Sequence, residues 1–426
     1  LYSFVDSVVV GRGIGAQALA AVGATSIVVW LTLGFAMGLT RGFFIHISQA
    51  YGKKDYHLVN RGFFVASVLS LIVGAMISIV GSLAIRDFLI LMHTPGEILE
   101  QSLDYIKVIL LGFVITVLNN LFMSVLQSLG DSSTPFWALL VSSVTNIGLD
   151  CVFVLTLKWG VQGAAAATVL SQVFSFAICA AGLKRLKFVS ILDGSKSKNA
   201  RLTVRMLKTG LPVGIMSMVT AVGGMILQFF VNDLGASAVA AYAASTKIRS
   251  VIGEFSNAMG MTFMTFVGQN YGAQKYDRIK AGVRMGVLLS ILIHIPLSAV
   301  EIFGGKRIAS LMVTDPPVLE LCRQYLLIVG IFVFFLGFLM VFRNCIQGMG
   351  NTWIPMLSGG LEVFSRLIFG YWLGRHSFMG IAAAEASAWI SVSIMLGSSF
   401  FILFRKVLRT QTPENTTDTK NIRTDS

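Results

Sequence analysis

Three polar side chains lie inside apolar stretches of the first half of the chain, where such side chains are uncommon. Asp6 lies five residues before Gly11, where the first loop on one side of the expected helices begins. Asp150 lies eight residues before Lys158, which is expected in a loop on the same side. Thr168 lies about six residues into the following apolar stretch. If these stretches are helices, a rise of about 1.5 Å per residue places all three side chains roughly 8–12 Å below the same surface.

The chemistry that these side chains could perform is the binding of a proton or a sodium ion. Asn146 lies one helical turn from Asp150, so amide and hydroxyl oxygens would join two carboxylates. Close carboxylates resist ionising together, so one of them can hold a proton, and oxygen ligands also suit a hard cation such as Na⁺. Alternatively, Asp150 hydrogen-bonds a neighbouring helix and Asp6 caps a helix end. The shared depth favours ion binding, and no other metal site is expected.

The second half of the chain has a different set of charged residues. Glu362 and Arg366 are four residues apart, so on one helix they would form a structural ion pair or, alternatively, contact a substrate. Glu254 is expected about eight residues into its helix, where it would bind a cation or pair with Lys247 and Arg249. Spacing alone also assigns no role to several polar residues within the apolar stretches of the two halves, Arg41, Lys107, Asn119, Asn120 and Arg343.

The composition indicates a membrane protein. Charged residues form 12% of the chain and hydrophobic residues 55%, and the mean hydropathy is +0.78. A soluble domain must keep its exterior polar and could not accommodate this much apolar surface. The net charge of +13 could suggest nucleic acid as a partner, but the basic residues lie mostly between apolar runs, where membrane topology explains them. The expected partner is membrane lipid, with no nucleic acid, and the protein is expected to be a monomer.

An all-α fold with twelve transmembrane helices is expected, because a span needs about 20 apolar residues. The stretch 1–10 is too short to cross a bilayer and lacks the basic start of a signal peptide, so it reads as the second half of a first helix. Basic residues concentrate in the loops on one side, which predicts that both termini are cytoplasmic in the cell membrane. The other apolar runs lie near 25–48, 62–85, 103–126, 136–157, 162–183, 210–231, 246–268, 283–304, 323–346, 354–374 and 380–404.

The second half of the chain repeats the first at a constant offset in residue number, which aligns 15–26 with 235–246 and 126–135 with 346–355. The aligned Gln, Gly and Pro residues would not arise from apolar similarity alone. Six helices per half give both halves the same orientation, so an axis along the membrane normal relates them. The predicted domains are an N-terminal six-helix lobe, a cytoplasmic linker, a C-terminal six-helix lobe and a polar cytoplasmic tail, at 1–183, 184–209, 210–404 and 405–426.

Several loop segments also carry a family resemblance. The start "LYSFVDSVVVGRGIGAQALAAVG", the pair "SQAYGKKDY" and "GQNYGAQKYD", and the pair "LQSLGDSSTP" and "IQGMGNTWIP" resemble loops of the multidrug and toxic compound extrusion (MATE) family. The resemblance implies two six-helix lobes that export cationic, often aromatic drugs in exchange for Na⁺ or H⁺. The NorM-like branch carries second-lobe carboxylates that 210–231 and 324–346 lack. In the DinF-like branch, the implied coupling-ion residues fall here on Asp6, Asn120, Asn146, Asp150 and Thr168.

The sequence thus predicts a secondary antiporter that exports organic cations and needs no cofactor beyond H⁺ or Na⁺. The 31 Phe and 18 Met residues suit a cavity that accepts bulky apolar cations. The repeat offset places Asp150 on Gly370 and Asn146 on Arg366, so the coupling ion is expected in the N-terminal lobe only.

The closest alternative is a lipid-linked oligosaccharide or lipid flippase of a related fold. It would need a cationic cleft, to which Arg41, Arg343 and Arg366 could contribute. An enzyme is not expected, because the five histidines lack metal-ligand spacing and no catalytic motif accompanies them. A passive channel is not expected either, because the sequence shows no ring of like charges and no filter-like loop.

Overall fold

The computed structural model describes residues 2–190, 193 and 199–409 of the chain, and these residues form helices joined by short turns. The helices of the first half are α1 (Tyr2–Gly13), α2 (Ala16–Gly52), α3 (Tyr56–Leu91), α4 (Gly96–Leu111), α5 (Phe113–Ser128), α6 (Ser133–Asp150) with its π-helical continuation η1 (Cys151–Thr156), and α7 (Gly160–Arg185). The helices of the second half are α9 (Ala200–Asp233), α10 (Ala236–Gly272), α11 (Tyr276–Ala299), η2 (Val300–Gly304), α12 (Gly305–Ala309), α13 (Pro316–Gly348), α14 (Trp353–Phe369), η3 (Gly370–Gly374) and α15 (Phe378–Arg409).

Among the described residues, eight helices are long and apolar enough to span a bilayer, and a bent pair raises the number to nine. The eight are α2, α3, α6 with η1, α7, α9, α11 with η2 and α12, α13, and α15, and the bent pair is α4 with α5. The helices α1, α10 and α14 lie beside these spans. Together they make the twelve-helix layout that the sequence predicts.

The break between α4 and α5 falls at Gly112, where the helix axes bend by 46°. A side chain at position 112 would overlap the side chain of Val169 on α7. Glycine therefore allows α7 to pack closely against the bend. The apolar run 103–126 predicts an unbroken helix. Hydropathy does not reveal this break, because the break is accompanied by close packing against another helix and by no change in apolar character.

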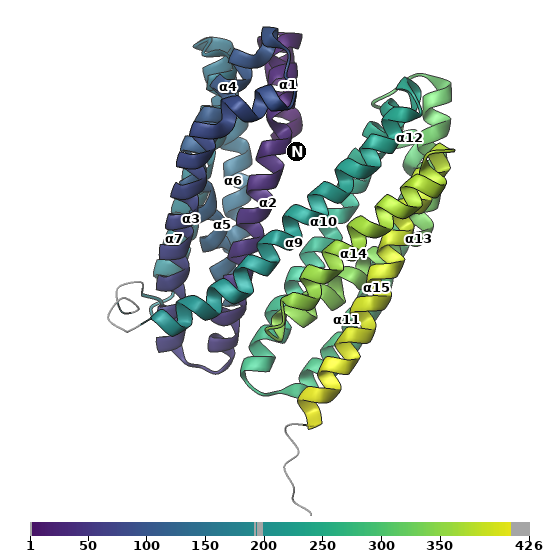
Figure 1. Ribbon diagram of the computed structural model, residues 1–426. Coiled ribbons are helices and arrows are strands. Elements are labelled where there is room, and N and C mark those ends of the chain that lie inside the picture. The colour runs from purple at the N-terminus through teal and green to yellow at the C-terminus, as the bar shows by residue number, and fades with distance from the viewer. Residues whose placement is uncertain (1, 191–192, 194–198, 410–426) are drawn as a thin grey trace, which may run out of the picture.

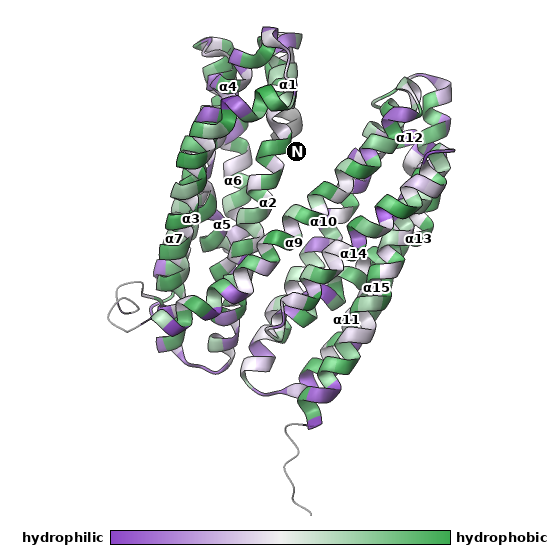
Figure 2. Cartoon of the chain, in the orientation of Figure 1, coloured by the Kyte–Doolittle hydropathy of each residue, from purple (hydrophilic) through white to green (hydrophobic). Residues whose placement is uncertain are grey.

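The helices form two bundles (Figure 1), α1–α7 and α9–α15, that lie close together at one end and diverge toward the end with α1, α4 and α12. The largest apolar core of the second bundle includes Trp389 and Tyr325, and that of the first includes Phe43 and Phe122. Hydrophobic residues cover the helix shafts and hydrophilic residues gather at the ends (Figure 2). Such apolar outer faces suit lipid as the surrounding solvent.

The sequence repeat is also a repeat of backbone conformation. The equivalent helices α2 and α10 each contain 37 residues. Gly130 and Gly350, which the repeat offset aligns, both have φ of 93°, and the equivalent pair Lys54 and Gln274 has φ of 60° and 58°. The π-helical segments η1 and η3 also occupy equivalent positions. The two halves therefore share turns and helix ends, as well as hydropathy.

The boundary regions differ from the predicted ranges. Helix α9 begins at Ala200, inside the range predicted as linker, because Leu202 and Met206 are one turn apart and pack into the apolar core of the first bundle. Helix α15 continues to Arg409, into the range predicted as tail. The rest of the predicted tail and the middle of the predicted linker lie outside the described residues.

Candidate ion site and central cleft

Asp6, Asn146 and Asp150 lie on helices that pack together. Asp6 lies on α1, and Asn146 and Asp150 lie in the last two turns of α6, which continues into η1. Helix α1 contacts α6, α7 and η1. The carboxylates of Asp6 and Asp150 are close enough to interact electrostatically. Asp6 and Asp150, which the sequence places at a common depth, thus lie on neighbouring helices of the fold.

These three side chains are buried without hydrogen-bond partners for most of their polar atoms. Their exposed fractions are 9% for Asp6, 1% for Asn146 and 0% for Asp150. Among the described residues, no partner is found for Oδ1 of Asp6, for either carboxylate oxygen of Asp150, or for the side-chain oxygen and nitrogen of Asn146. Buried polar atoms are normally paired. A proton or a small cation held among these oxygens would supply the missing interactions, so the residues fit the predicted kind of ligand.

Thr168 and Asn120 have different surroundings. Thr168 is half-buried on α7, and its main-chain carbonyl accepts a hydrogen bond from the Ser171 hydroxyl at 2.8 Å. Asn120 on α5 donates a hydrogen bond from Nδ2 to the Thr116 carbonyl at 2.9 Å and lines a cleft between the bundles. Thr168 therefore lies on α7, which packs against the helices α1 and α6 that carry Asp6 and Asp150, whereas Asn120 faces the cleft.

The cleft has a volume of about 640 Å³ and is lined by α2, α5 and α6 of the first bundle and by α10 of the second. Its lining combines methionine and phenylalanine with side-chain amides. These apolar and amide residues include Met37, Met123, Met261, Phe136, Phe266, Asn120 and Asn257. A flexible apolar lining of this kind can adapt to ligands of different shapes.

The position of Glu254 corrects the sequence prediction. Helix α10 begins at Ala236, so Glu254 lies near the middle of the helix, where it is exposed to the cleft and shares the lining with Arg41. Arg249 likewise lies well inside α10, and its ion-pair partner is Glu385. The apolar window 246–268 misses the first turns of α10, because those turns contain polar and small residues.

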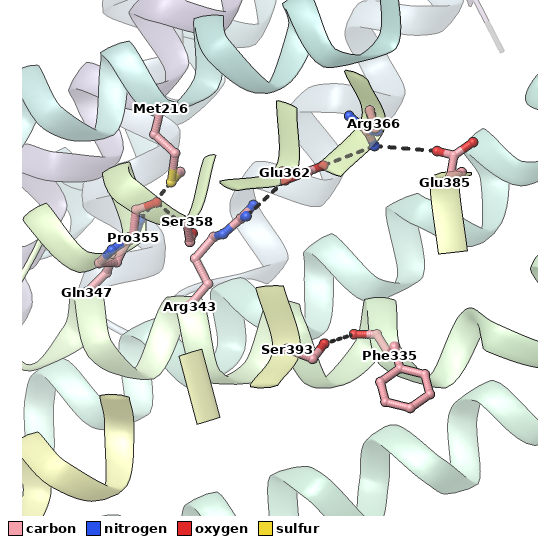
Figure 3. Close-up of polar contacts among 10 residues, drawn as sticks. All are labelled: Met216, Phe335, Arg343, Gln347, Pro355, Ser358, Glu362, Arg366, Glu385 and Ser393. Atoms are coloured by element: carbon pink, nitrogen blue, oxygen red, sulfur yellow. Dashed lines mark hydrogen bonds and ion pairs between the residues drawn. The ribbon is translucent and has the colours of Figure 1, made fainter. Parts of the chain in front are cut away.

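A series of ion pairs crosses the interior of the second bundle (Figure 3). Arg343 Nη2 on α13 lies 3.0 Å from Glu362 Oε2 on α14, and the other carboxylate oxygen of Glu362 lies 3.0 Å from Arg366 Nη2. Arg366 Nη2 also lies 3.4 Å from Glu385 Oε1 on α15. Arg249 Nη1 on α10 reaches the same oxygen at 3.0 Å. Glu362 and Arg366 thus belong to a larger network that joins α10, α13, α14 and α15.

Sequence reasoning did not identify Arg249, Glu301 or Glu385 as members of this network. Glu301 in η2 is buried, both of its carboxylate oxygens lack a hydrogen-bond partner among the described residues, and it interacts electrostatically with Arg249 and Glu385. The sequence signal that could have identified Glu301 and Glu385 is that each is an isolated acid within an apolar run, 283–304 and 380–404. The sequence could not show this network, because most of its partners are far apart along the chain.

Removing Arg343 from this network is expected to destabilise the protein strongly. Arg343→Met would leave Glu362 buried with half of its partners, and breaking a buried ion pair costs about 3–5 kcal/mol. The measurement is the free energy of unfolding of the purified protein in mixed micelles. Arg323→Met is the matched control, because Arg323 forms an exposed ion pair with Glu320 on the same helix, and it should change stability little. Equal effects of the two substitutions would contradict the prediction.

The bundles are joined by two symmetry-related hydrogen bonds. Gln49 Nε2 of α2 donates to the main-chain carbonyl of Gly348, the last residue of α13, at 2.9 Å. Gln269 Nε2 of α10 donates to the main-chain carbonyl of Ser128, the last residue of α5, at 2.9 Å. The repeat offset aligns the two donors with each other and the two acceptors with each other. We refer to these two bonds as the glutamine latches.

Close packing surrounds the glutamine latches. A side chain at Gly52 would overlap the main-chain carbonyl of Gln269, and one at Gly272 would overlap that of Gln49. Hydrogen bonds from Ser48 Oγ to the Thr265 carbonyl and from Thr265 Oγ1 to the Gln127 carbonyl, both at 3.3 Å, also cross between the bundles. The buried apolar cluster beside them consists of Phe44, Ile45 and Met264. The bundles are therefore tightly closed at this end.

A duplicated helical bundle with a cleft between its halves and buried ionisable residues is typical of membrane transporters. The family model MatE matches residues 1–152 and 212–372. The chain therefore belongs to the MatE family, whose members are transporters and not enzymes.

Individual relatives agree with this assignment. The probable multidrug resistance protein YoeA of Bacillus subtilis (strain 168) is 27% identical over 400 residues, which cover 89% of this chain and 86% of that protein. The crystal structure of MATE in the bent conformation has a TM-score of 0.89 and 24% identity, covering 96% of this chain and 92% of that one. The outward-facing structure of a multidrug resistance MATE family transporter of the MOP superfamily has a TM-score of 0.89 and 23% identity over the same shares. These structures show the fold.

Proposed function

We propose that this protein is a secondary antiporter that exports drug-like organic cations in exchange for H⁺ or Na⁺. The observation that carries the proposal is the pair of buried carboxylates, Asp6 and Asp150. Oδ1 of Asp6 and both carboxylate oxygens of Asp150 lack protein partners among the described residues. Ionisable groups at membrane depth are costly and commonly mark ion pathways. Asn146 and Thr168 would add oxygen ligands to the two carboxylates, and the ion would be bound in the N-terminal half.

The proposed orientation in the membrane follows from charge. The latch end carries the loops between α2 and α3 and between α10 and α11, which contain Lys53, Lys54 and Lys275. Basic loops favour the cytoplasm, so this end would be the cytoplasmic one, and the C-terminal end of α15 lies on the same side (Figure 1). The structure would then correspond to an outward-open form, in which the two bundles separate toward the cell exterior (Figure 1).

In the proposed mechanism, ion binding and substrate release are linked through α1. Helix α1 carries Asp6 and packs against α6, which carries Asp150. A proton or Na⁺ between the two carboxylates would remove their repulsion and favour one arrangement of these helices over another. Since a ligand shifts a conformational equilibrium only by its differential affinity for the two states, the ion must bind this outward-open arrangement more tightly than the inward-open one. Rocking of the bundles would then require the latches to break.

The flippase alternative receives less support from the structure. Of the three arginines that could have formed a cationic cleft, only Arg41 lines the cleft. Arg343 and Arg366 are buried in ion pairs with Glu362 and Glu385. They are therefore not positioned to bind a pyrophosphate in the cleft.

Transport in reconstituted vesicles tests the proposed function. Proteoliposomes loaded with ethidium should exchange the dye when an inward Na⁺ gradient or an inward proton gradient is imposed, and one of the two gradients should suffice. Dissipating the active gradient with the matching ionophore should stop the exchange. Absence of gradient-driven movement under both conditions would contradict the proposal.

A further inference from the structure

The cleft contains one basic and one acidic side chain, each from a different bundle. Among the residues that line it, Arg41 of α2 is the base and Glu254 of α10 is the acid, and the other lining residues are uncharged. The two charges are close enough to interact electrostatically. Within the described part of the chain, however, neither side chain forms a salt bridge or a side-chain hydrogen bond.

These two charges are not products of the internal repeat. The repeat offset places Arg41 on Met261 and Glu254 on Gly34, so each charge is unique to its half. The helices that carry them are equivalent, and the backbone of the two halves repeats closely. The cleft is therefore electrically asymmetric, with a positive wall on the first bundle and a negative wall on the second.

An unpaired charge in a membrane protein needs water or a ligand to offset its desolvation. Glu254 is exposed and Arg41 is half-buried, so both can reach a molecule in the cleft. The apolar part of the same lining includes Met37, Met123 and Met261. A molecule that satisfies all of these groups has an apolar body, a cationic group for Glu254 and an anionic group for Arg41.

We infer that the preferred substrates are amphoteric organic molecules that carry a carboxylate or similar anion together with an amine. This inference rests on the proposed function and specifies its substrate class. The anion would bind the Arg41 guanidinium, which can donate two parallel hydrogen bonds to a carboxylate. The amine would bind Glu254, and Asn120 and Asn257 would contact the remaining polar atoms. Because the charges lie on different bundles, an amphoteric substrate bridges the two halves, whereas a simple cation engages the second half alone.

A matched pair of dyes tests the inference. Rhodamine 110 carries a free carboxylate, and rhodamine 123 is its methyl ester, so the two differ in this one anionic group. Binding to the purified full-length chain would be measured by fluorescence anisotropy near neutral pH. Arg41→Gln should weaken the binding of rhodamine 110 about tenfold, as expected for the loss of a charge-assisted hydrogen bond, and leave rhodamine 123 unchanged or more tightly bound.

Control variants keep the test interpretable. Glu254→Gln should weaken the binding of both dyes, and Arg41→Lys should retain part of the preference for rhodamine 110 if Arg41→Gln fails to fold. Arg86→Gln, which removes an exposed ion pair with Glu100, should change neither dye. If Arg41→Gln weakens both dyes equally, Arg41 acts on the conformation of the cleft and the inference is wrong.

The same proteoliposomes separate this inference from the proposed function. If wild-type protein drives neither dye under an ion gradient, the antiporter proposal fails, and the inference about transported substrates fails with it. If rhodamine 123 is exported but Arg41→Gln does not discriminate between the dyes, the antiporter proposal stands and the inference alone is overturned.

Discussion

Replacing Asp150 with Asn is expected to reduce ion-driven dye export to the level of protein-free vesicles. The amide keeps the size and most of the hydrogen-bonding capacity of the carboxylate, but it neither ionises nor takes up a proton. Asp150 is fully buried next to Asn146, and its two oxygens have no partner among the described residues. The substitution therefore removes the charge that would bind the coupling ion while disturbing the packing little. Asp6→Asn should have a similar effect, since Asp6 would contribute the second carboxylate.

The measurement compares the initial rate of dye export in proteoliposomes under the gradient that drives the wild type. Asp87→Asn is a suitable control, because Asp87 is exposed on α3 and its neutralisation should leave the rate unchanged. The amount of protein in the vesicles and its thermal stability must match the wild type. Export at the normal rate in a properly folded Asp150→Asn protein would remove Asp150 from the coupling mechanism.

The second large effect is expected at the end where the glutamine latches join the bundles, from Gly52→Ala. A Cβ atom at this position would overlap the main-chain carbonyl of Gln269, and main-chain atoms cannot move aside as a side-chain end can. Overpacking of this kind costs about 1–3 kcal/mol, which corresponds to roughly a 5- to 150-fold change in the balance between the closed and open forms of this end. Under the proposed alternating-access mechanism transport should fall accordingly, because the form that is closed at this end would no longer be sufficiently populated.

The distance between spin labels at Lys54 and Gln274, in a protein with exposed Cys151 replaced by Ser, reports this change. It should shift toward longer values in Gly52→Ala and also in Gly272→Ala, which faces the carbonyl of Gln49. Gly253→Ala is the matched control on α10, because a Cβ atom there would meet no neighbour. An unchanged distance distribution in Gly52→Ala would show that the glycine contact does not limit closure.

The architecture could be predicted from the sequence because its main signals are local. Long apolar runs identify the spans, and matching turn sequences at a constant offset identify the duplication. The bend at Gly112 and the early start of α9 could not be predicted in this way. Both depend on contacts with other helices, those of Gly112 with Val169 and of Met206 with the core of the first bundle.

The residues of the candidate site also differ in whether a local sequence signal could identify them. Asp6 and Asp150 were accessible to sequence reasoning, because a depth along a helix can be counted from a loop. The network of Arg249, Glu385 and Glu301 was not accessible, since its members come from helices distant in the chain and the start of α10 was placed too late. The shared cleft of Arg41 and Glu254 was hidden for the same reason.

The glutamine latches end on main-chain carbonyls and never on side chains of the opposite half. Every helix end offers such a carbonyl whatever its amino-acid type. A substitution at Ser128 that keeps the backbone in place would therefore leave the joint between the halves intact. After duplication, each half could thus diverge in its own chemistry, one toward isolated acids and the other toward compensated charges, without coordinated changes at the seam that holds them together.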